Sequence, residues 1–154
     1  MKQDRFLLII LVVIGLLVIV AVSLFFIQQE PLEYGTEESP EGVLKNYVLS
    51  LQLGDYHRAY NYLQNNDDKP DFNTFQQALL RNSGEFPRST IRIGEAVVMG
   101  NNSQVDITII HTDNDPFSRD WVENSLATLT NQDNRWYIVN MPYPYWGWDW
   151  YIRE

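Results

Sequence analysis

The sequence predicts an α+β domain preceded by one apolar helix, and three observations support this class. Residues 6–27 form an unbroken apolar run, FLLIILVVIGLLVIVAVSLFFI. Apolar residues then recur every three or four positions from Pro40 to about Ser83, and every second position after Pro87. A period near four is typical of amphipathic helices and a period of two of strands. Helices followed by a run of strands are typical of helices packed on one face of a curved antiparallel sheet.

The apolar run predicts a transmembrane helix over residues 6–27. At ~1.5 Å per residue it would extend roughly 33 Å, which is enough to cross a hydrocarbon core of about 30 Å. A cleaved secretory signal is the alternative, and its apolar core is usually ~7–15 residues long and ends at small residues. Here the bulky residues Leu24 to Ile27 follow Ala21-Val22-Ser23, which favours an uncleaved anchor.

The charges around the run predict its orientation. Lys2 and Arg5 precede it, and acidic residues follow it. The positive-inside rule therefore places residues 1–5 in the cytoplasm and the rest of the chain outside. We expect a single-pass signal anchor in the cell membrane, in contact with the bilayer through residues 6–27, and a periplasmic or extracellular C-terminal domain.

Residues 28–39, QQEPLEYGTEES, are polar and acidic and predict a linker. Ser39 is a suitable N-cap for a helix that begins at Pro40 and continues to about Leu53. Asp55 can cap a second helix, and Asp71 a third one that ends near Ser83-Gly84.

The second half of the domain predicts four strands joined by turns. Gly94 suggests a bulge in the first strand. The second strand follows the turn Gly100-Asn101-Asn102 and ends at His111. The loop TDNDPF precedes the third strand, and the turn NQDN precedes the fourth. The first, third and fourth strands are expected at residues 89–99, 119–130 and 135–140.

The segment from Pro40 to Leu63, PEGVLKNYVLSLQLGDYHRAYNYL, precedes a third helix and four strands that end in RWYIV. In this element order and in its LxxGDYxxAYxYL pattern, the chain resembles the nuclear-transport-factor-two-like superfamily over residues 40–140. The resemblance implies a cystatin-like cone of three helices in a bent sheet, of the membrane-tethered bacterial type. A tetratricopeptide helix pair is the competing match, but such solenoids need at least about three repeats.

The composition argues against several classes of function. The chain has 20 acidic and 11 basic residues, and a net charge of −9 repels nucleic acid. It has no cysteine, so thiol nucleophiles, Cys-ligated zinc, iron–sulfur clusters and c-type haem are absent. We expect no cofactor and no bound metal.

The sequence shows no pattern that is typical of a catalytic site. His57 lies off the apolar face of its helix, and His111 lies close to Asp113, a pair that is able to transfer protons. The acidic residues Asp113, Asp115 and Asp120 lack the glycine and the final glutamate of a calcium loop. We therefore predict a protein that is not an enzyme, with no catalytic, cofactor-binding or metal residues.

The C-terminal segment, residues 141–154, is unusually rich in aromatic residues. One interpretation is a last strand in which tryptophans spaced by two cover the open end of the cone. The other is a contact surface, because Trp and Tyr dominate binding hot spots. The candidate partner contacts are Tyr143, Tyr145, Trp146, Trp148, Trp150 and Tyr151.

Two functions remain open. We favour a non-catalytic accessory or assembly subunit of a larger bacterial membrane complex, whose outer domain contacts other membrane protein subunits. A respiratory or photosynthetic electron-transfer complex is one example of such a host. The alternative is a membrane-tethered cone domain, outside the cytoplasm, that binds or transforms a small ligand, with Tyr47, Tyr60 and His111 as pocket candidates.

Overall fold

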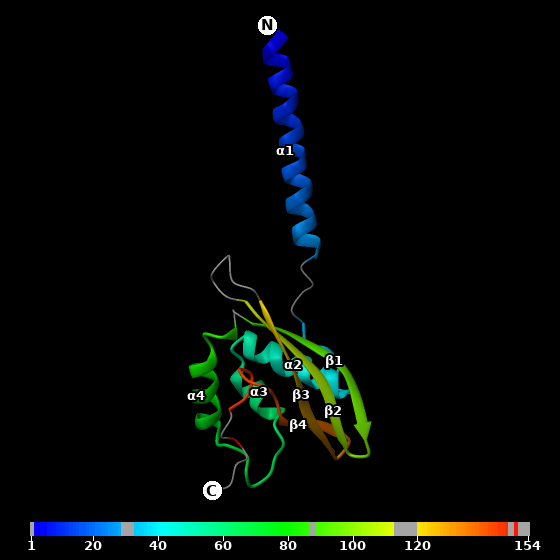
Figure 1. The fold of residues 1–154 in the computed structure, drawn as a ribbon, viewed down its shortest axis with the longest axis vertical. Coiled ribbons are helices and arrows are strands. Elements are labelled where there is room, and N and C mark those ends of the chain that lie inside the picture. Colours follow the sequence, from blue (N-terminus) through cyan, green and yellow to red (C-terminus); the bar gives the residue numbers. More distant parts are fainter. Residues whose placement is uncertain (1, 29–32, 87–88, 113–119, 148–149, 151–154) are drawn as a thin grey trace. The chain divides into compact units, whose positions relative to one another are not determined.

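The computed structural model describes the chain except for residues 1, 29–32, 87–88, 113–119, 148–149 and 151–154. The chain divides into two compact units, Met1–Glu33 and Tyr34–Glu154. The first unit is built on one helix, and the second contains the remaining helices and all the described strands (Figure 1).

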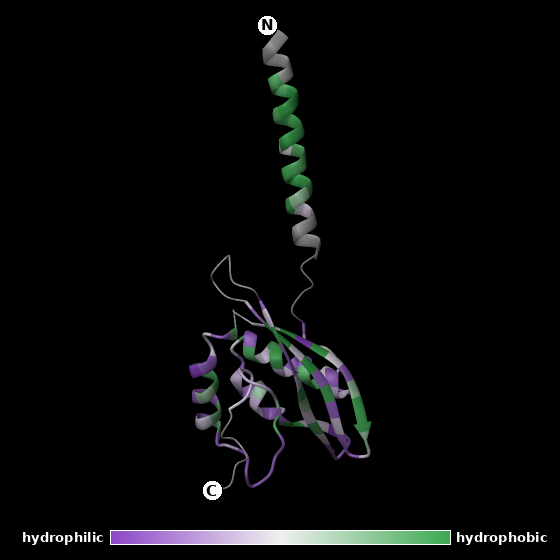
Figure 2. Ribbon diagram, viewed as in Figure 1, coloured by the Kyte–Doolittle hydropathy of each residue, from purple (hydrophilic) through white to green (hydrophobic). Residues whose placement is uncertain are grey.

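The first helix, α1, spans Lys2–Gln28, and the coloured part of its ribbon is mostly the green of hydrophobic residues (Figure 2). Among the residues that the structure describes, no helix combines the length and the apolarity needed to cross a membrane. This finding corrects the prediction of a transmembrane helix over residues 6–27. The predicted signal anchor, bilayer contact and single-pass membrane localisation are corrected with it.

The second unit contains three helices whose N-termini are capped as the sequence predicts. The Ser39 Oγ accepts a hydrogen bond from a backbone N–H of the first turn of α2, and the carboxylates of Asp55 and Asp71 do the same for α3 and α4. Gly54, at a φ of 71°, adopts the left-handed conformation between α2 and α3. The bounds are Pro40–Gln52 for α2, Tyr56–Asn61 for α3 and Phe72–Asn82 for α4.

The four strands form one antiparallel sheet in the order β1-β2-β3-β4, so the predicted α+β class is confirmed. The predicted bulge lies in β1, where the register shifts between Ile93 and Ala96. At Gly94 an added Cβ would come within 3.1 Å of Asp106, so a side chain there would require Asp106 to shift by a few tenths of an ångström. The bounds are Ser89–Met99 for β1, Asn102–His111 for β2, Trp121–Gln132 for β3 and Arg135–Asn140 for β4.

Both edges of the sheet are partly covered. At the bulge in β1, the Glu41 carboxylate of α2 accepts a hydrogen bond of 2.8 Å from the Ala96 N–H. On β4, the Ile138 N–H donates to the Tyr62 carbonyl at 2.8 Å, and the Gln64 N–H donates to the Ile138 carbonyl at 2.9 Å. Some of the backbone hydrogen-bonding groups at the two edge strands are therefore paired within the chain.

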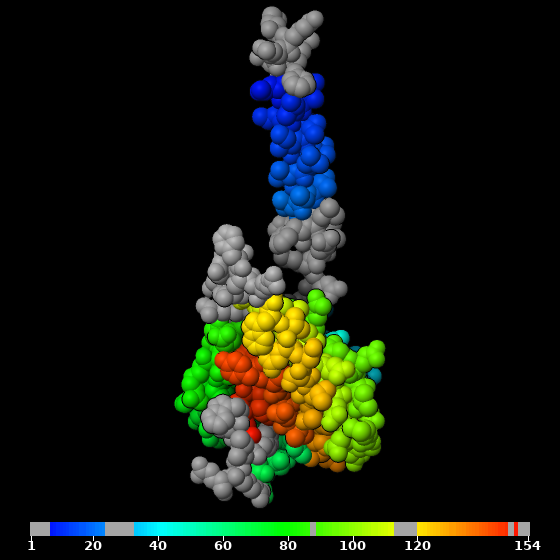
Figure 3. Space-filling model, in the orientation of Figure 1, coloured from blue at the N-terminus to red at the C-terminus, as the bar shows by residue number. Residues whose placement is uncertain are grey.

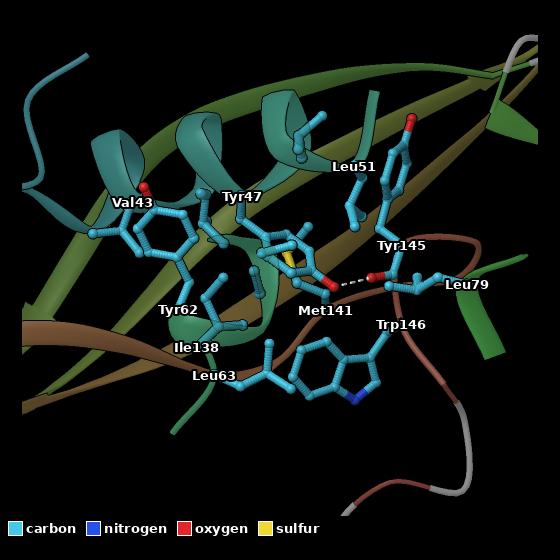
Figure 4. Close-up of a cluster of buried hydrophobic side chains, with 14 of the residues drawn as sticks. Val43, Tyr47, Leu51, Tyr62, Leu63, Leu79, Ile138, Met141, Tyr145 and Trp146 are labelled. Atoms are coloured by element: carbon cyan, nitrogen blue, oxygen red, sulfur yellow. Dashed lines mark hydrogen bonds between the residues drawn. The ribbon is translucent and has the colours of Figure 1, made fainter. Parts of the chain in front are cut away.

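The core lies between the helices and the inner face of the sheet, and α2 packs directly on β1, β2 and β4 (Figure 1). Every second residue of β2 is buried, and the register pairs these residues with inward-facing residues of β3. Helical and strand side chains meet the C-terminal segment in this core (Figure 4). The largest fully buried side chains are Tyr47, Tyr145, Phe75, Leu44, Leu63, Leu79, Ile107, Ile109, Leu129, Ile138, Val43 and Val105.

Part of the predicted linker belongs to the folded unit. The buried Asn46 side chain accepts a hydrogen bond from the Gly35 N–H at 2.8 Å and donates one to the Gly35 carbonyl at 3.0 Å. The Glu37 carboxylate accepts a hydrogen bond of 2.7 Å from the Tyr62 hydroxyl and forms an ion pair of 3.4 Å with Arg58. Residues 34–39 are thus attached to the helices.

Candidate functional site

The interior of the cone is filled at the position of Tyr47, the first predicted pocket residue. The Tyr47 ring is fully buried, and its hydroxyl donates a hydrogen bond of 2.7 Å to the Tyr145 carbonyl (Figure 4). Its ring centroid lies 6.4 Å from that of Trp146. Tyr47 therefore links α2 to the C-terminal segment inside the core.

The C-terminal aromatic segment supplies much of this filling. Tyr145, Trp146 and Trp150 are buried, at 1%, 4% and 5% exposure. Trp150 packs against Phe75 of α4 at 5.1 Å between ring centroids. Of the six predicted contact residues, these three are therefore core residues in this chain rather than surface residues.

The other three predicted contact residues are Tyr143, Trp148 and Tyr151. Tyr143 is half exposed, and Trp148 and Tyr151 lie outside the described residues. Among the described residues of this segment, 141–147 and 150, turns and bends are present and no strand. Burial raises the pKa of Tyr145, although a hydrogen bond to Ser89 opposes this effect, so its phenol stays protonated at neutral pH.

Tyr60, the second pocket candidate, lies between α3 and α4. Its hydroxyl donates to the Pro70 carbonyl at 2.8 Å, and the Lys69 ammonium lies 4.0 Å above its ring. Burial and the charge of Asp71 raise the pKa of Tyr60, whereas burial lowers the pKa of Lys69. The Tyr60 ring also packs edge-on against Phe72 and thus helps to join the helices.

His111, the third candidate, lies at the end of β2 on the inner face of the sheet. Its ring stacks on Trp121 of β3 at 3.9 Å between centroids, and its Nε2 lies 3.4 Å from the Glu123 carboxylate. The register explains this cluster, because His111 pairs directly with Trp121. The predicted neighbour Asp113 lies outside the described residues.

The remaining polar candidates are not gathered into a site. His57 stacks on Phe72 of α4 at 4.0 Å, Asp120 is exposed, and Asp115 lies outside the described residues. Within the described part of the chain, no group of three His, Cys, Asp or Glu side chains is placed to hold a metal ion.

The sheet presents an outer patch that the sequence analysis did not identify. Val97, Gln104 and Thr128 lie directly opposite one another on β1, β2 and β3. Met99 follows Val97 by two residues on β1, and Leu126 precedes Thr128 by two residues on β3, so they share this face but lie on opposite sides of the row. The three apolar members are 60%, 53% and 45% exposed at Val97, Met99 and Leu126. We call these five residues the outer patch.

The strands that carry the outer patch belong to a broad continuous surface of the domain, coloured from yellow-green to orange (Figure 3). The patch itself contains no charged residue, whereas the whole chain has a net charge of −9. Depletion of charge with retained apolar area is the compositional feature of interface centres.

An opening lies among the helices, separate from the outer patch. It is a groove with a volume of about 530 Å³, at the C-terminal ends of α2 and α4. Its lining residues are Leu51, Gln52, Leu53, Gly54, Tyr56, Ser83 and Phe86.

Comparison with solved structures finds similar folds. A SEC-C motif-containing protein of Rhodopseudomonas palustris has a TM-score of 0.50 and 13% identity, over 69% of this chain and 79% of that chain. An NTF2-like protein of Campylobacter jejuni, proposed to be a transpeptidase, has a TM-score of 0.49 and 18% identity, over 67% of this chain and 99% of that chain. An uncharacterised cystatin-fold protein of Novosphingobium aromaticivorans has a TM-score of 0.42 and 12% identity, over 69% of this chain and 100% of that chain.

At these identities the similarity of the three structures concerns the fold alone. They do not show the membrane-tethered type. A fold of this kind accommodates enzymes as well as binding proteins. No protein-family model matches the chain, and no curated protein matches it.

Proposed function

We propose that the chain is a non-catalytic accessory subunit of a larger protein complex, and that its folded domain binds a partner protein through the outer patch. The observation that carries the proposal is an exposed, uncharged and largely apolar patch on a strongly acidic chain. Covering apolar surface of this kind with a partner protein lowers the free energy, because the surface is removed from water.

The state of the interior supports a binding role over a catalytic one. Tyr47, a predicted pocket residue, packs against the chain's own C-terminal aromatic residues. The His111 Nε2 lies 3.4 Å from the Glu123 carboxylate, and the imidazole ring stacks on Trp121. General acid–base catalysis needs the proton-transferring atom within reach of a substrate.

The outer patch is also positioned on rigid elements. Its members come from three strands that are hydrogen-bonded to one another in continuous register from Ala96 onward. Asp106 borders the patch beside Leu126 and gives it a charged rim. Gln104 lies in the middle of the patch, and the apolar residues Val97, Met99 and Leu126 lie around it.

A charge placed in the patch tests the proposal. Tagged wild type, Leu126→Glu and Leu80→Glu chains are produced in the native cells, and their complexes are separated by native electrophoresis. Leu80 of α4 is 50% exposed and lies outside the patch, so it is a matched control. We expect wild type and Leu80→Glu to migrate in one heavier complex, and Leu126→Glu to migrate as the free 18.1 kDa chain.

Two results would refute the proposal. In one, Leu126→Glu stays in the complex as fully as the control does. In the other, light scattering of the purified wild type shows a homodimer that Leu126→Glu dissociates, in which case the patch binds a second copy.

A further inference from the structure

Met99 places an oxidisable sulfur atom on the outer patch. It is the last residue of β1 and is 53% exposed. Asn102 of β2 lies directly opposite it, across the turn at Gly100 and Asn101. Two positions earlier on the same face, Val97 is 60% exposed. A thioether at this place is accessible to small solutes in the free domain.

The chain offers few other sulfur atoms to an oxidant. It has three methionines and no cysteine, so the thiolate that usually reacts first with peroxides is absent. Met141 is 3% exposed in the core, and Met1 lies outside the described residues. Among the residues that the structure describes, Met99 is therefore the sulfur-containing side chain that a dissolved oxidant reaches.

The reaction needs a hydroperoxide as its only co-reactant. A lone pair on the Met99 Sδ attacks the distal oxygen of the hydroperoxide, so that an S–O bond forms and the O–O bond breaks. The proton of the distal oxygen passes to the alkoxide that leaves, and the products are methionine sulfoxide and an alcohol, or water when the oxidant is hydrogen peroxide. The sulfur loses two electrons and the peroxide gains them. Reductases specific for each sulfoxide epimer reverse the oxidation.

Oxidation changes the chemistry of the outer patch. Val97, Met99 and Leu126 are its apolar residues, and the sulfoxide makes one of them polar. The sulfoxide oxygen is a hydrogen-bond acceptor, and covering it with the apolar surface of a partner leaves it without a donor. An unpaired buried polar group opposes association.

From these observations we propose that Met99 is an oxidation site, and that its sulfoxide prevents the outer patch from binding the partner protein. The inference rests on the proposed function, because it assigns a regulation to the same patch. A chain without cysteine thereby responds to peroxide through a surface methionine, and reduction of the sulfoxide restores binding.

The selectivity of the oxidation is measured on the purified full chain. The chain is treated with hydrogen peroxide for increasing times, and the sulfoxide at each methionine is quantified by mass spectrometry of its peptides. We expect Met99 to be oxidised at least about tenfold faster than Met141, because Met141 is buried. In the urea-unfolded chain the two rates should become similar. Equal rates in the folded chain would overturn the proposal.

The effect on binding is measured in extracts of native cells from which the gene is deleted. The tagged chain is treated with hydrogen peroxide, the peroxide is destroyed with catalase, and the chain is added at increasing concentration. Native electrophoresis then gives the concentration at which incorporation into the complex is half-maximal. Oxidation should raise this concentration roughly fivefold to hundredfold, as expected for burial of an unpaired polar group. Treatment with both sulfoxide reductases should lower it again.

Two variants assign the effect to Met99. Each is compared with and without peroxide, so that its own affinity for the complex does not enter the result. Met99→Leu has no thioether at this position and should show no change on treatment, whereas Met141→Leu keeps Met99 and should respond as wild type does. A response of Met99→Leu equal to that of wild type would overturn the proposal. Because the reversal by the reductases and the peptide measurement use the wild-type chain, a variant that fails to fold does not prevent the decision.

The same extracts separate this inference from the proposed function. If Leu126→Glu is incorporated as fully as untreated wild type, the proposed function fails and the regulation fails with it. If Leu126→Glu is excluded while oxidised wild type is incorporated normally, the proposed function stands and the regulation by oxidation alone is refuted. Loss of the far-ultraviolet circular dichroism of the oxidised chain would also refute the regulation, because the effect would then be unfolding.

Discussion

Replacing Trp146 with alanine tests whether the C-terminal aromatic segment is part of the core. The indole is 4% exposed and lies 4.8 Å from the Trp150 ring, edge-on. Burial of roughly 200 Å² at about 25 cal/mol/Å² contributes ~5 kcal/mol, an upper bound that a compact denatured state lowers to about 3–4 kcal/mol. Measured Trp→Ala substitutions in cores cost a similar ~3–5 kcal/mol.

Urea denaturation, followed by the fluorescence of the remaining tryptophans, measures this cost. With an m value of ~1.5 kcal/mol/M, a loss of about 3 kcal/mol lowers the midpoint by about 2 M. Tyr143→Ala in the same segment is the matched control and should cost less than about 0.5 kcal/mol, because Tyr143 is half exposed. If Trp146→Ala costs less than about 1 kcal/mol, or no more than the control, the assignment of Trp146 to the core is refuted. Trp146→Phe, with an expected intermediate cost, keeps the test usable where the alanine variant unfolds.

Two further predictions concern polar contacts. Asn46→Ala removes both hydrogen bonds to Gly35 and should lower the free energy of unfolding by about 1–3 kcal/mol. The same variant should speed hydrogen exchange at the Gly35 amide. Unchanged exchange would contradict the attachment of residues 34–39 to the helices. For Glu41, burial raises the pKa, but hydrogen bonds from the N–H groups of Glu41 and Ala96, together with Ser39 and Lys45, outweigh it and hold the pKa below its ordinary value. A lowered folded-state pKa stabilises the fold above the unfolded-state pKa, and this contribution is lost as the pH falls through the folded-state value. The stability difference between wild type and Glu41→Gln should therefore narrow below about pH 4.5 in urea titrations, and a difference that is constant with pH would show that the charge of Glu41 contributes nothing.

Local signals explain why much of the fold was predictable. Ser39, Asp55 and Asp71 are caps that act within three residues, and each helix begins next to its cap. The predicted bounds of β1 and β4 agree with the structure, and β3 begins and ends two residues later than expected. Alternation and turn residues determine such elements without help from distant contacts.

Long-range contacts explain what was missed. Residues 34–39 have the composition of a linker, but Asn46 and Arg58 bind them from other helices. Tryptophans spaced by two predicted a strand face in the C-terminal segment. Burial of Trp146 and Trp150 against α4 and Tyr47 depends instead on the assembled core.

The candidate sites were less predictable than the fold, because they depend on register. Neither Trp121 nor Glu123 was identified from sequence, although both lie beside His111 once β2 and β3 are paired. The outer patch requires the same knowledge, since Val97 and Thr128 are 31 positions apart and meet only across β2. The alternation of Leu126 with inward residues was the one local signal available.

The covered strand edges determine how this domain is able to associate. An open edge recruits any extended chain, which leads to strand addition and aggregation. Here the Glu41 carboxylate accepts a hydrogen bond from the Ala96 N–H at the bulge of β1, and the backbone at Leu63 pairs with Ile138 on β4. An exposed apolar face combined with restricted edges favours partners that match the face by shape. At these two positions the backbone groups of the edge strands are already paired within the domain, which disfavours strand addition there.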